Sequence, residues 1–177
     1  MAVLDILVFP DATLKQASEP VTVFDDALRQ FIADLDETRL SAPGCVGIAA
    51  PQVGRFQRVA IVDVSNNPKH SSHGLMVLVN PEIVAWEGYK KGREGCLSVP
   101  DYTGNVMRAT SITLEAQDAD GNMQRFDCEG FEAVAVQHEI DHLDGILFID
   151  RLGRLKRELL KKKIEKALGK EEKYAVL

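Results

Sequence analysis

The sequence has no apolar run that approaches the roughly 20 residues of a membrane-spanning helix. It has three cysteines in 177 residues, and this odd, low count argues against a framework of disulfides. Internal repeats and low-complexity stretches are also lacking. With 45% hydrophobic and 27% charged residues, the chain is typical of a soluble, globular protein of one domain.

We also expect no targeting segment in this sequence. The first residues, MAVLDILVFPDA, carry no basic group, and their apolar run is interrupted by Asp5 and ends at Pro10. This pattern fits neither a secretory signal nor a transit peptide. We therefore expect a cytoplasmic protein that has no membrane partner.

The net charge of −6 is divided unevenly along the chain. Residues 151–177 hold 10 Lys and Arg against 4 acidic residues, whereas residues 1–150 hold 11 against 23. An acidic body argues against nonspecific binding of nucleic acid, so we expect no DNA partner. The basic end is either an interaction arm or a solvated helix.

Apolar residues at helical spacing predict three helices, over residues 25–41, 130–142 and 154–168. Asp25 or Asp26 can cap the first helix. A glycine just past the second helix is at the favoured C-terminal position. The apolar stripe of the third helix consists of Leu155, Leu159, Leu160 and Ile164.

Runs rich in β-formers predict strands between the first two helices. The runs cover residues 58–64, 75–79 and 83–86, followed by a hairpin of 105–117 and 123–128 with an Asp-Gly turn. Phe148 and Ile149 suggest a final strand. Because the strands cluster rather than alternate with the helices, the pattern predicts an α+β fold with a sheet next to a central helix.

The second predicted helix contains the motif H-E-x-x-H at residues 138–142. Its histidines are one turn apart on one helix face, so one metal ion can bind both. Glu139 lies about 100° around the helix from His138 and can reach a water on the ion without being a ligand. The alternative is a helix that carries two surface histidines.

A catalytic site of this kind uses three protein ligands, so a third must come from elsewhere. Phe148 stands where metzincin-type proteases have a histidine, and Glu158 and Glu165, where thermolysin-type enzymes have a glutamate, are better explained as ion-pair partners. Cys96, in the stretch EGCLSVP, offers a thiol that ionises readily beside histidines and a cation. Its alternative role is that of a small, buried hydrophobic residue.

A third stretch, residues 44–54, reads GCVGIAAPQVG, and its small residues allow close approach of the backbone. A buried Gln52 must donate its amide hydrogens, either within a tight loop or to a developing oxyanion.

Two further groups of residues are not expected to take part in the chemistry. His70 and His73 lie in a polar loop and are expected to be solvated, and Cys128 is expected to fill the core or the hairpin.

Taken together and in this order, the stretches Cys45–Gln52, Glu94–Ser98 and His138–His142 resemble the motifs of the peptide deformylase family. Those motifs are G-x-G-Φ-A-A-x-Q, E-G-C-x-S and H-E-x-x-H. The separations, the chain length and the basic C-terminal helix also fit, so the resemblance covers nearly the whole chain. It implies an α+β fold whose central H-E-x-x-H helix packs against antiparallel β-sheets, with N-terminal and C-terminal helices.

The resemblance also implies a function. The protein would remove the formyl group from N-formylmethionine of nascent polypeptides, releasing formate. One divalent metal ion would activate the water that attacks the formyl carbon, with Fe²⁺ characteristic of the family and Zn²⁺, Ni²⁺ or Co²⁺ tolerated. Residues 1–150 would form the catalytic domain, and residues 151–177 a basic helix and tail of the same domain that could contact the ribosome.

Residue roles follow from the same resemblance. Cys96, His138 and His142 would bind the metal, Glu139 would act as general base and acid, and Gln52 and the backbone N–H of Leu97 would bind the oxyanion. The expected substrate-binding residues are Val46, Gly47, Gly95, Arg108, Phe131, Val134 and Ala135, with His138 also bordering the methionine pocket.

One position departs from the family pattern, since Cys45 stands where the first motif begins with glycine. A side chain there could narrow the mouth of the site or add an oxidisable thiol. Two other functions stay open, a zinc metallopeptidase and a non-catalytic, metal-containing protein that binds peptide N-termini. The metallopeptidase would share H-E-x-x-H but lacks a convincing downstream ligand, and the intact Glu139 and Gln52 disfavour the binding protein.

Overall fold

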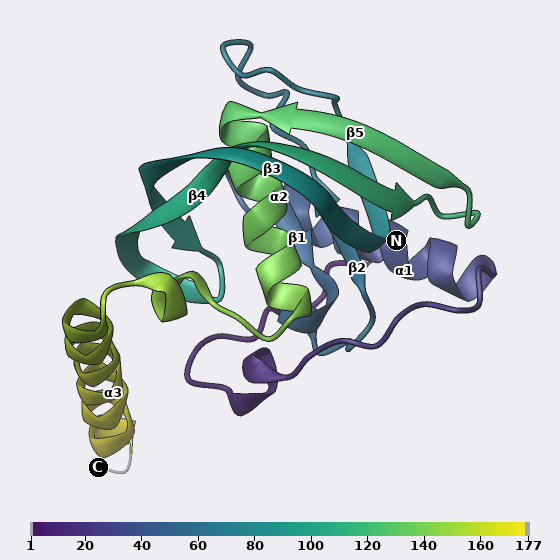
Figure 1. Ribbon diagram of the computed structural model, residues 1–177. Helices are drawn as coiled ribbons and strands as arrows, with labels where there is room; N and C mark the ends of the chain where they lie inside the picture. The colour runs from purple at the N-terminus through teal and green to yellow at the C-terminus, as the bar shows by residue number, and fades with distance from the viewer. Residues whose placement is uncertain (1, 176–177) are drawn as a thin grey trace.

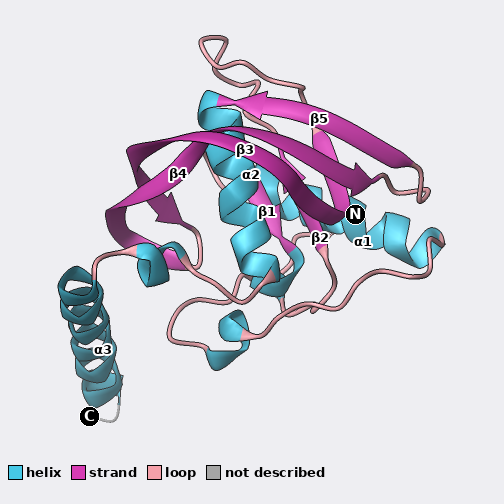
Figure 2. Cartoon of the chain, in the orientation of Figure 1, coloured by secondary structure: helices cyan, strands magenta, loops and turns pink. Residues whose placement is uncertain are grey.

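The structure is a computed structural model that describes the backbone of residues 2–175 and the side chains of residues 2–168. It has three α-helices and five strands, with short 3₁₀ helices between them, and it confirms the predicted α+β class (Figures 1 and 2). No helix in this described part has the length and apolar character needed to cross a membrane. The helices are α1 (Asp26–Ser41), α2 (Gly130–Leu143) and α3 (Arg154–Ala175), and the strands are β1 (Gly47–Ala49), β2 (Val59–Val62), β3 (Met76–Cys96), β4 (Val99–Gln117) and β5 (Met123–Glu129).

The five strands form one antiparallel sheet in the order β1-β2-β3-β4-β5. Figure 1 shows α2 at the centre of the molecule, with strands around it, and α3 projecting from one side. The core beneath α2 joins apolar side chains of β2, β3 and β4 to one face of the helix. Its buried members include Val62, Leu78, Ile112, Leu114, Ala133 and Val136. This burial fixes which face of α2 is left to carry the site.

Helix α1 forms where the sequence predicts it. The Asp25 side chain accepts a hydrogen bond from the backbone N–H of Leu28 at 2.9 Å, which satisfies a donor at the helix start. The predicted apolar face is buried against β1 and β2. Its members are Leu28, Phe31, Ile32 and Leu35.

The two short strands predicted over 75–79 and 83–86 are parts of one strand, β3. Asn80 lies between them in a left-handed conformation, with φ of 51°, and the pairing with β4 shifts register there. Its side chain bonds both backbone groups of Val21, so the Asn-Pro pair makes an irregularity within the strand rather than a turn. β3 then continues to Cys96 through a mostly exposed stretch that lacks the apolar alternation of a half-buried strand.

The strand predicted at Phe148 and Ile149 is wrong. These residues begin a 3₁₀ helix, Phe148–Arg151, and both side chains are buried. The Asp150 carboxylate accepts a hydrogen bond from the Leu147 N–H at 2.9 Å and turns the backbone there. A short apolar pair cannot by itself distinguish a strand from a buried turn.

Helix α3 also forms as predicted, but half of its predicted apolar stripe faces solvent. Leu155 and Leu159 are 73% and 60% exposed. Ile164 is buried, and Leu160 packs at the edge of the same cluster as Leu14 and Leu152. The helix therefore contacts the body through a narrower face than the sequence predicts.

The Asp25 cap gives a direct test of the local fold. We expect Asp25→Ala to lower the free energy of unfolding by about 1 kcal/mol, because the Leu28 N–H loses its acceptor. Asp26→Ala is the matched control, since the exposed Asp26 contacts only Arg29 at the surface among the described residues. Urea unfolding measures both variants, and an equal effect of the two substitutions would contradict the capping role.

Candidate metal-binding active site

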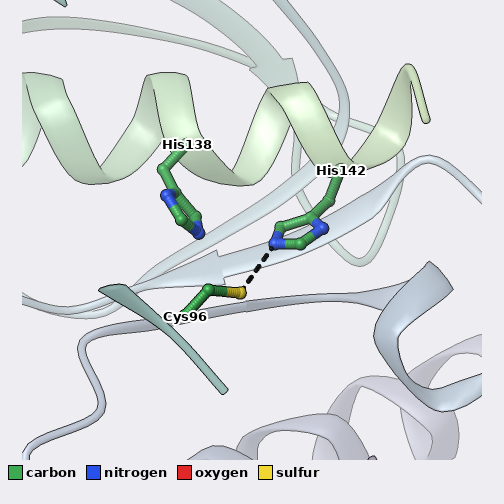
Figure 3. Close-up of side chains that lie close together, drawn as sticks. All are labelled: Cys96, His138 and His142. Atoms are coloured by element: carbon green, nitrogen blue, oxygen red, sulfur yellow. Dashed lines mark hydrogen bonds between the residues drawn. The ribbon is translucent and has the colours of Figure 1, made fainter. Parts of the chain in front are cut away.

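The three side chains predicted as metal ligands converge on one point. His138 and His142 extend from α2 one turn apart, with ring centroids 5.1 Å apart. The Sγ atom of Cys96, at the end of β3, lies 3.3 Å from Nε2 of His142 (Figure 3). One potential ligand atom from each residue lies within 4.8 Å of the other two.

Two structural features bring these residues together. The spacing of H-E-x-x-H fixes the relation of the two histidines as soon as α2 forms. Cys96 reaches them because β3 and β4 join by a tight connection, in which Cys96 pairs with Val99. The position of the Cys96 thiol thus depends on the long hairpin, and the positions of the two histidines depend on the helix.

A buried network of charges holds His138. Its Nδ1 lies 2.9 Å from Oε1 of Glu94. Arg108 donates one hydrogen bond to each oxygen of the same carboxylate, at 2.8 Å to Oε2 and 2.9 Å to Oε1. Burial alone would raise the pKa of Glu94, but the bonds from Arg108 and His138 lower it to about 2. A histidine that donates Nδ1–H to an ionised carboxylate keeps Nε2 free to bind a metal.

Arg108 completes the network by donating to Oδ2 of Asp141 at 2.6 Å. Its guanidinium is buried between the two carboxylates. Arg108 was predicted to bind substrate, but in the structure its partners are the carboxylates of Glu94 and Asp141, which the sequence did not suggest. Its contact with substrate stays a prediction.

Glu139 lies against Gly47 and is only 4% exposed. A Cβ atom on Gly47 would come within 2.5 Å of Oε2 of Glu139, so any larger residue here would force the carboxylate to shift. Oε1 of Glu139 has no hydrogen-bond partner among the described residues. In the metal-free protein, burial raises the pKa of Glu139 to about 7.

His142 is the other side chain of the site with an unpartnered buried atom, its Nδ1, within the described part of the chain. Burial lowers its pKa, so the ring is neutral and can act as a ligand. A thiol, two imidazoles and unpartnered buried polar atoms together fit a divalent ion.

Gln52 is buried in the 3₁₀ helix Ala50–Val53. Its Oε1 accepts a hydrogen bond from the Ala49 N–H at 2.9 Å, which orients the amide. Its Nε2 donates to Oγ of Ser98 at 3.1 Å and lies 3.6 Å from Sγ of Cys96. The amide is thus anchored on one side and points its hydrogens at the site on the other.

A cavity of about 340 Å³ borders Gln52, Cys96, His138 and Glu139. A second cavity, of about 610 Å³, adjoins Phe131 and includes Val134 and Arg108. The predicted residues that line the first cavity are Val46, Gly47, Gln52, Gly95, Cys96, Leu97, Phe131, Ala135, His138 and Glu139.

Cys45 also lines the first cavity. Its Sγ donates to the carbonyl oxygen of Gly47 at 3.1 Å, and burial raises the pKa of this thiol to about 11. The thiol therefore stays protonated and occupies one wall of the cavity.

The sequence did not predict a role for Glu94 or Asp141, although both lie within the quoted motifs.

An H-E-x-x-H helix with a third ligand and an unpartnered glutamate is typical of metal-dependent hydrolases. Comparison with known proteins gives the family. The family model described as polypeptide deformylase matches residues 3–158. The chain therefore belongs to the polypeptide deformylase family.

Individual relatives agree over nearly the full chain. The peptide deformylase of Alkalilimnicola ehrlichii is 46% identical, over 94% of this chain and 91% of that protein, and the one from Syntrophobacter fumaroxidans is 45% identical, over 95% and 97%. A crystal structure of a peptide deformylase from Legionella pneumophila has a TM-score of 0.85 at 40% identity, covering 97% of this chain and 98% of that one. The Ehrlichia chaffeensis enzyme in complex with actinonin has a TM-score of 0.87 at 35% identity, covering 94% and 98%.

The buried network makes a testable contribution to stability. We expect Arg108→Met to lower the free energy of unfolding by about 3–5 kcal/mol, because the buried Glu94 loses its arginine and the buried Asp141 is left with Arg151 alone. Arg125→Met removes an exposed ion pair with Glu115 and should cost about 0–1 kcal/mol. Urea unfolding compares the two, and equal stability of the variants would contradict a structural role for the Arg108 pairs.

Proposed function

We propose that the protein hydrolyses the formyl group from N-formylmethionyl peptides and releases formate. The observation that carries this proposal is that Cys96, His138 and His142 meet beside a cavity lined by an unpartnered Glu139 and an anchored Gln52, in a member of the polypeptide deformylase family. Hydrolysis of a formamide needs an activated water, a stabilised oxyanion and a proton for the leaving amine. The site has a residue for each need.

Cys96, His138 and His142 would hold one divalent ion. When bound, the ion acts as a Lewis acid on the carbonyl and makes water a stronger acid. A thiolate with two imidazoles suits Fe²⁺, and the same donors accept Zn²⁺, Ni²⁺ or Co²⁺. We propose Fe²⁺ as the native ion because it is characteristic of the family that the sequence resembles.

Glu139 moves the proton. Its unpartnered Oε1 can accept the proton of the attacking water and later give it to the amine nitrogen. Gly47 supports this role, because the absence of a side chain there leaves room for the carboxylate. Glu139 is adjacent to a ligand in sequence, but its place around the helix lets it serve as a base rather than a ligand.

Gln52 and the backbone N–H of Leu97 would donate hydrogen bonds to the oxyanion that develops on the formyl oxygen. Such a donor is typically worth about 2.7–4 kcal/mol of the barrier. The bond from the Ala49 N–H to Gln52 supports this assignment, because an amide fixed beforehand needs no reorientation during the reaction.

The substrate peptide would pair with the backbone of Val46, Gly47 and Gly95, beside the cavity that they line. Its methionine side chain would enter between Phe131, Val134 and Ala135, with Arg108 behind them. Close walls suit a formyl carbon, which carries only hydrogen, and exclude larger acyl groups. Cys45 adds a side chain to this wall.

We also propose a cytoplasmic location and contact with the ribosome through α3, which belongs with residues 1–150 to one domain. Arg154, Lys162 and Lys163 are exposed on this helix and can meet a polyanion. Lys161 and Arg157 are less available, since they contact Asp150 and Glu158 respectively.

Glu139→Gln separates metal binding from catalysis. We expect this variant to keep its ion and lose formate release from a formyl-Met peptide by a factor of about 10² to 10⁴, because the proton carrier is gone. Asp144→Asn, an exposed acid at the end of the same helix, should retain activity. Metal analysis and formate assay of each variant would exclude the role if Glu139→Gln turned over normally, or if it lost its ion.

A further inference from the structure

A second group of potential metal ligands lies in the described part of the chain, at the start of α2. His73 comes from the loop between β2 and β3, Cys128 from the end of β5 and Glu132 from the first turn of the helix. One potential ligand atom from each residue lies within 4.8 Å of the other two. Cys128 and Glu132 straddle the junction of β5 and α2, so secondary structure fixes two of the three positions.

The carboxylate of Glu132 is the unusual member of this group, because it is only 1% exposed. It accepts a hydrogen bond from the backbone N–H of His73 at 2.7 Å, and its Oε1 lies 2.5 Å from Nδ1 of that residue. Among the described residues, its ion pair is with His73 and with no lysine or arginine. A buried carboxylate needs a compensating positive charge, which a bound cation can supply.

A divalent cation would supply that charge. A thiolate, a carboxylate and a neutral imidazole carry two negative charges, so an M²⁺ ion makes the whole group neutral and suited to a buried place. A thiolate with an imidazole favours Zn²⁺ over Mg²⁺ or Ca²⁺. Burial and the charge of Glu132 raise the pKa of the Cys128 thiol to about 12, so an ion that binds there must displace its proton.

The group is also accessible from outside. His73 is exposed in part, and a cavity of about 420 Å³ is bordered by Ser72, His73 and Cys128. An ion can enter by this route, and a water can complete four-coordination on the open side.

We propose that His73, Cys128 and Glu132 form a second divalent-ion site, selective for Zn²⁺, which fastens the loop of residues 65–75 to α2. The ring of His70 in this loop packs against Phe131 in a tilted arrangement with centroids 4.6 Å apart, and Phe131 lines the active-site cavity. The ion would thus also support one wall of that cavity. The site is independent of the proposed deformylase function, since it shares no ligand with the first site.

Counting ions in the full-length protein tests this site. After removal of metal with a chelator, the protein is exposed to buffered free Zn²⁺, and native mass spectrometry counts the ions bound. We expect two in the wild type, one in His73→Ala and two in His70→Ala, the matched control in the same loop. A single ion in the wild type, or two in His73→Ala, would overturn the proposal.

Two further variants guard against loss of folding and against confusion with the first site. Glu132→Gln keeps the size of the side chain and an acceptor for the His73 N–H, and we expect it to fold and bind one ion. Cys96→Ala should also bind one ion, which the double variant Cys96→Ala/His73→Ala should lose. Retention of that ion by the double variant would show that His73 is not a ligand, whatever the outcome for deformylase activity.

Proton release gives an independent readout. Binding of Zn²⁺ to the second site of Cys96→Ala should release about one proton, from Cys128, in weakly buffered solution. Cys96→Ala/Cys128→Ser should bind more weakly and release none from this position. Equal proton release by both proteins would contradict coordination by the Cys128 thiolate.

Discussion

The guanidinium of Arg108 bridges two buried carboxylates, Glu94 of β3 and Asp141 of α2, and the geometry of the active site depends on this bridge. It connects the long hairpin, which carries Cys96, to the helix that carries both histidines. Through Glu94 it also holds Nδ1 of His138 and so leaves Nε2 free to bind a metal. A second cation, Arg151, bonds the outer side of Asp141. Without these cations the two carboxylates would repel each other and attract water into the base of the site.

The sequence predicted the parts of the site that local rules determine. Helical periodicity alone relates His138 to His142 and places Glu139 off their face. The third predicted ligand was different, because Cys96 precedes His138 by 42 residues and reaches it only through the β3–β4 hairpin. No spacing rule describes that contact. The roles of Glu94 and Asp141 were missed for a related reason. Both are acidic residues in motifs whose other residues had assigned roles. Their common partner, Arg108, lies on a third element, β4.

The fold shows the same division between local and non-local information. α1 was predictable because its cap and its buried face both lie within a few residues of one another. The polar half of β3 was not, since it is defined by pairing with β4 and carries no apolar alternation. Phe148 and Ile149 suggested a strand because both favour β-structure. In the structure they lie in a 3₁₀ helix, where the Asp150 carboxylate accepts a hydrogen bond from the Leu147 N–H. Solvation of His73 was expected from its polar loop, and its contact with Glu132 depends on the packing of that loop on α2.

The central claim is that the protein, at the site formed by Cys96, His138 and His142, hydrolyses the formyl amide of a peptide rather than its internal peptide bonds. The direct test is a metal analysis of anaerobically purified protein, followed by incubation with a formyl-Met peptide and, separately, with an unformylated peptide of the same sequence. The account predicts formate release in proportion to the ion held by these three residues, with the unformylated peptide left intact. Cleavage of internal bonds, or no formate from protein that holds its ion, would contradict it.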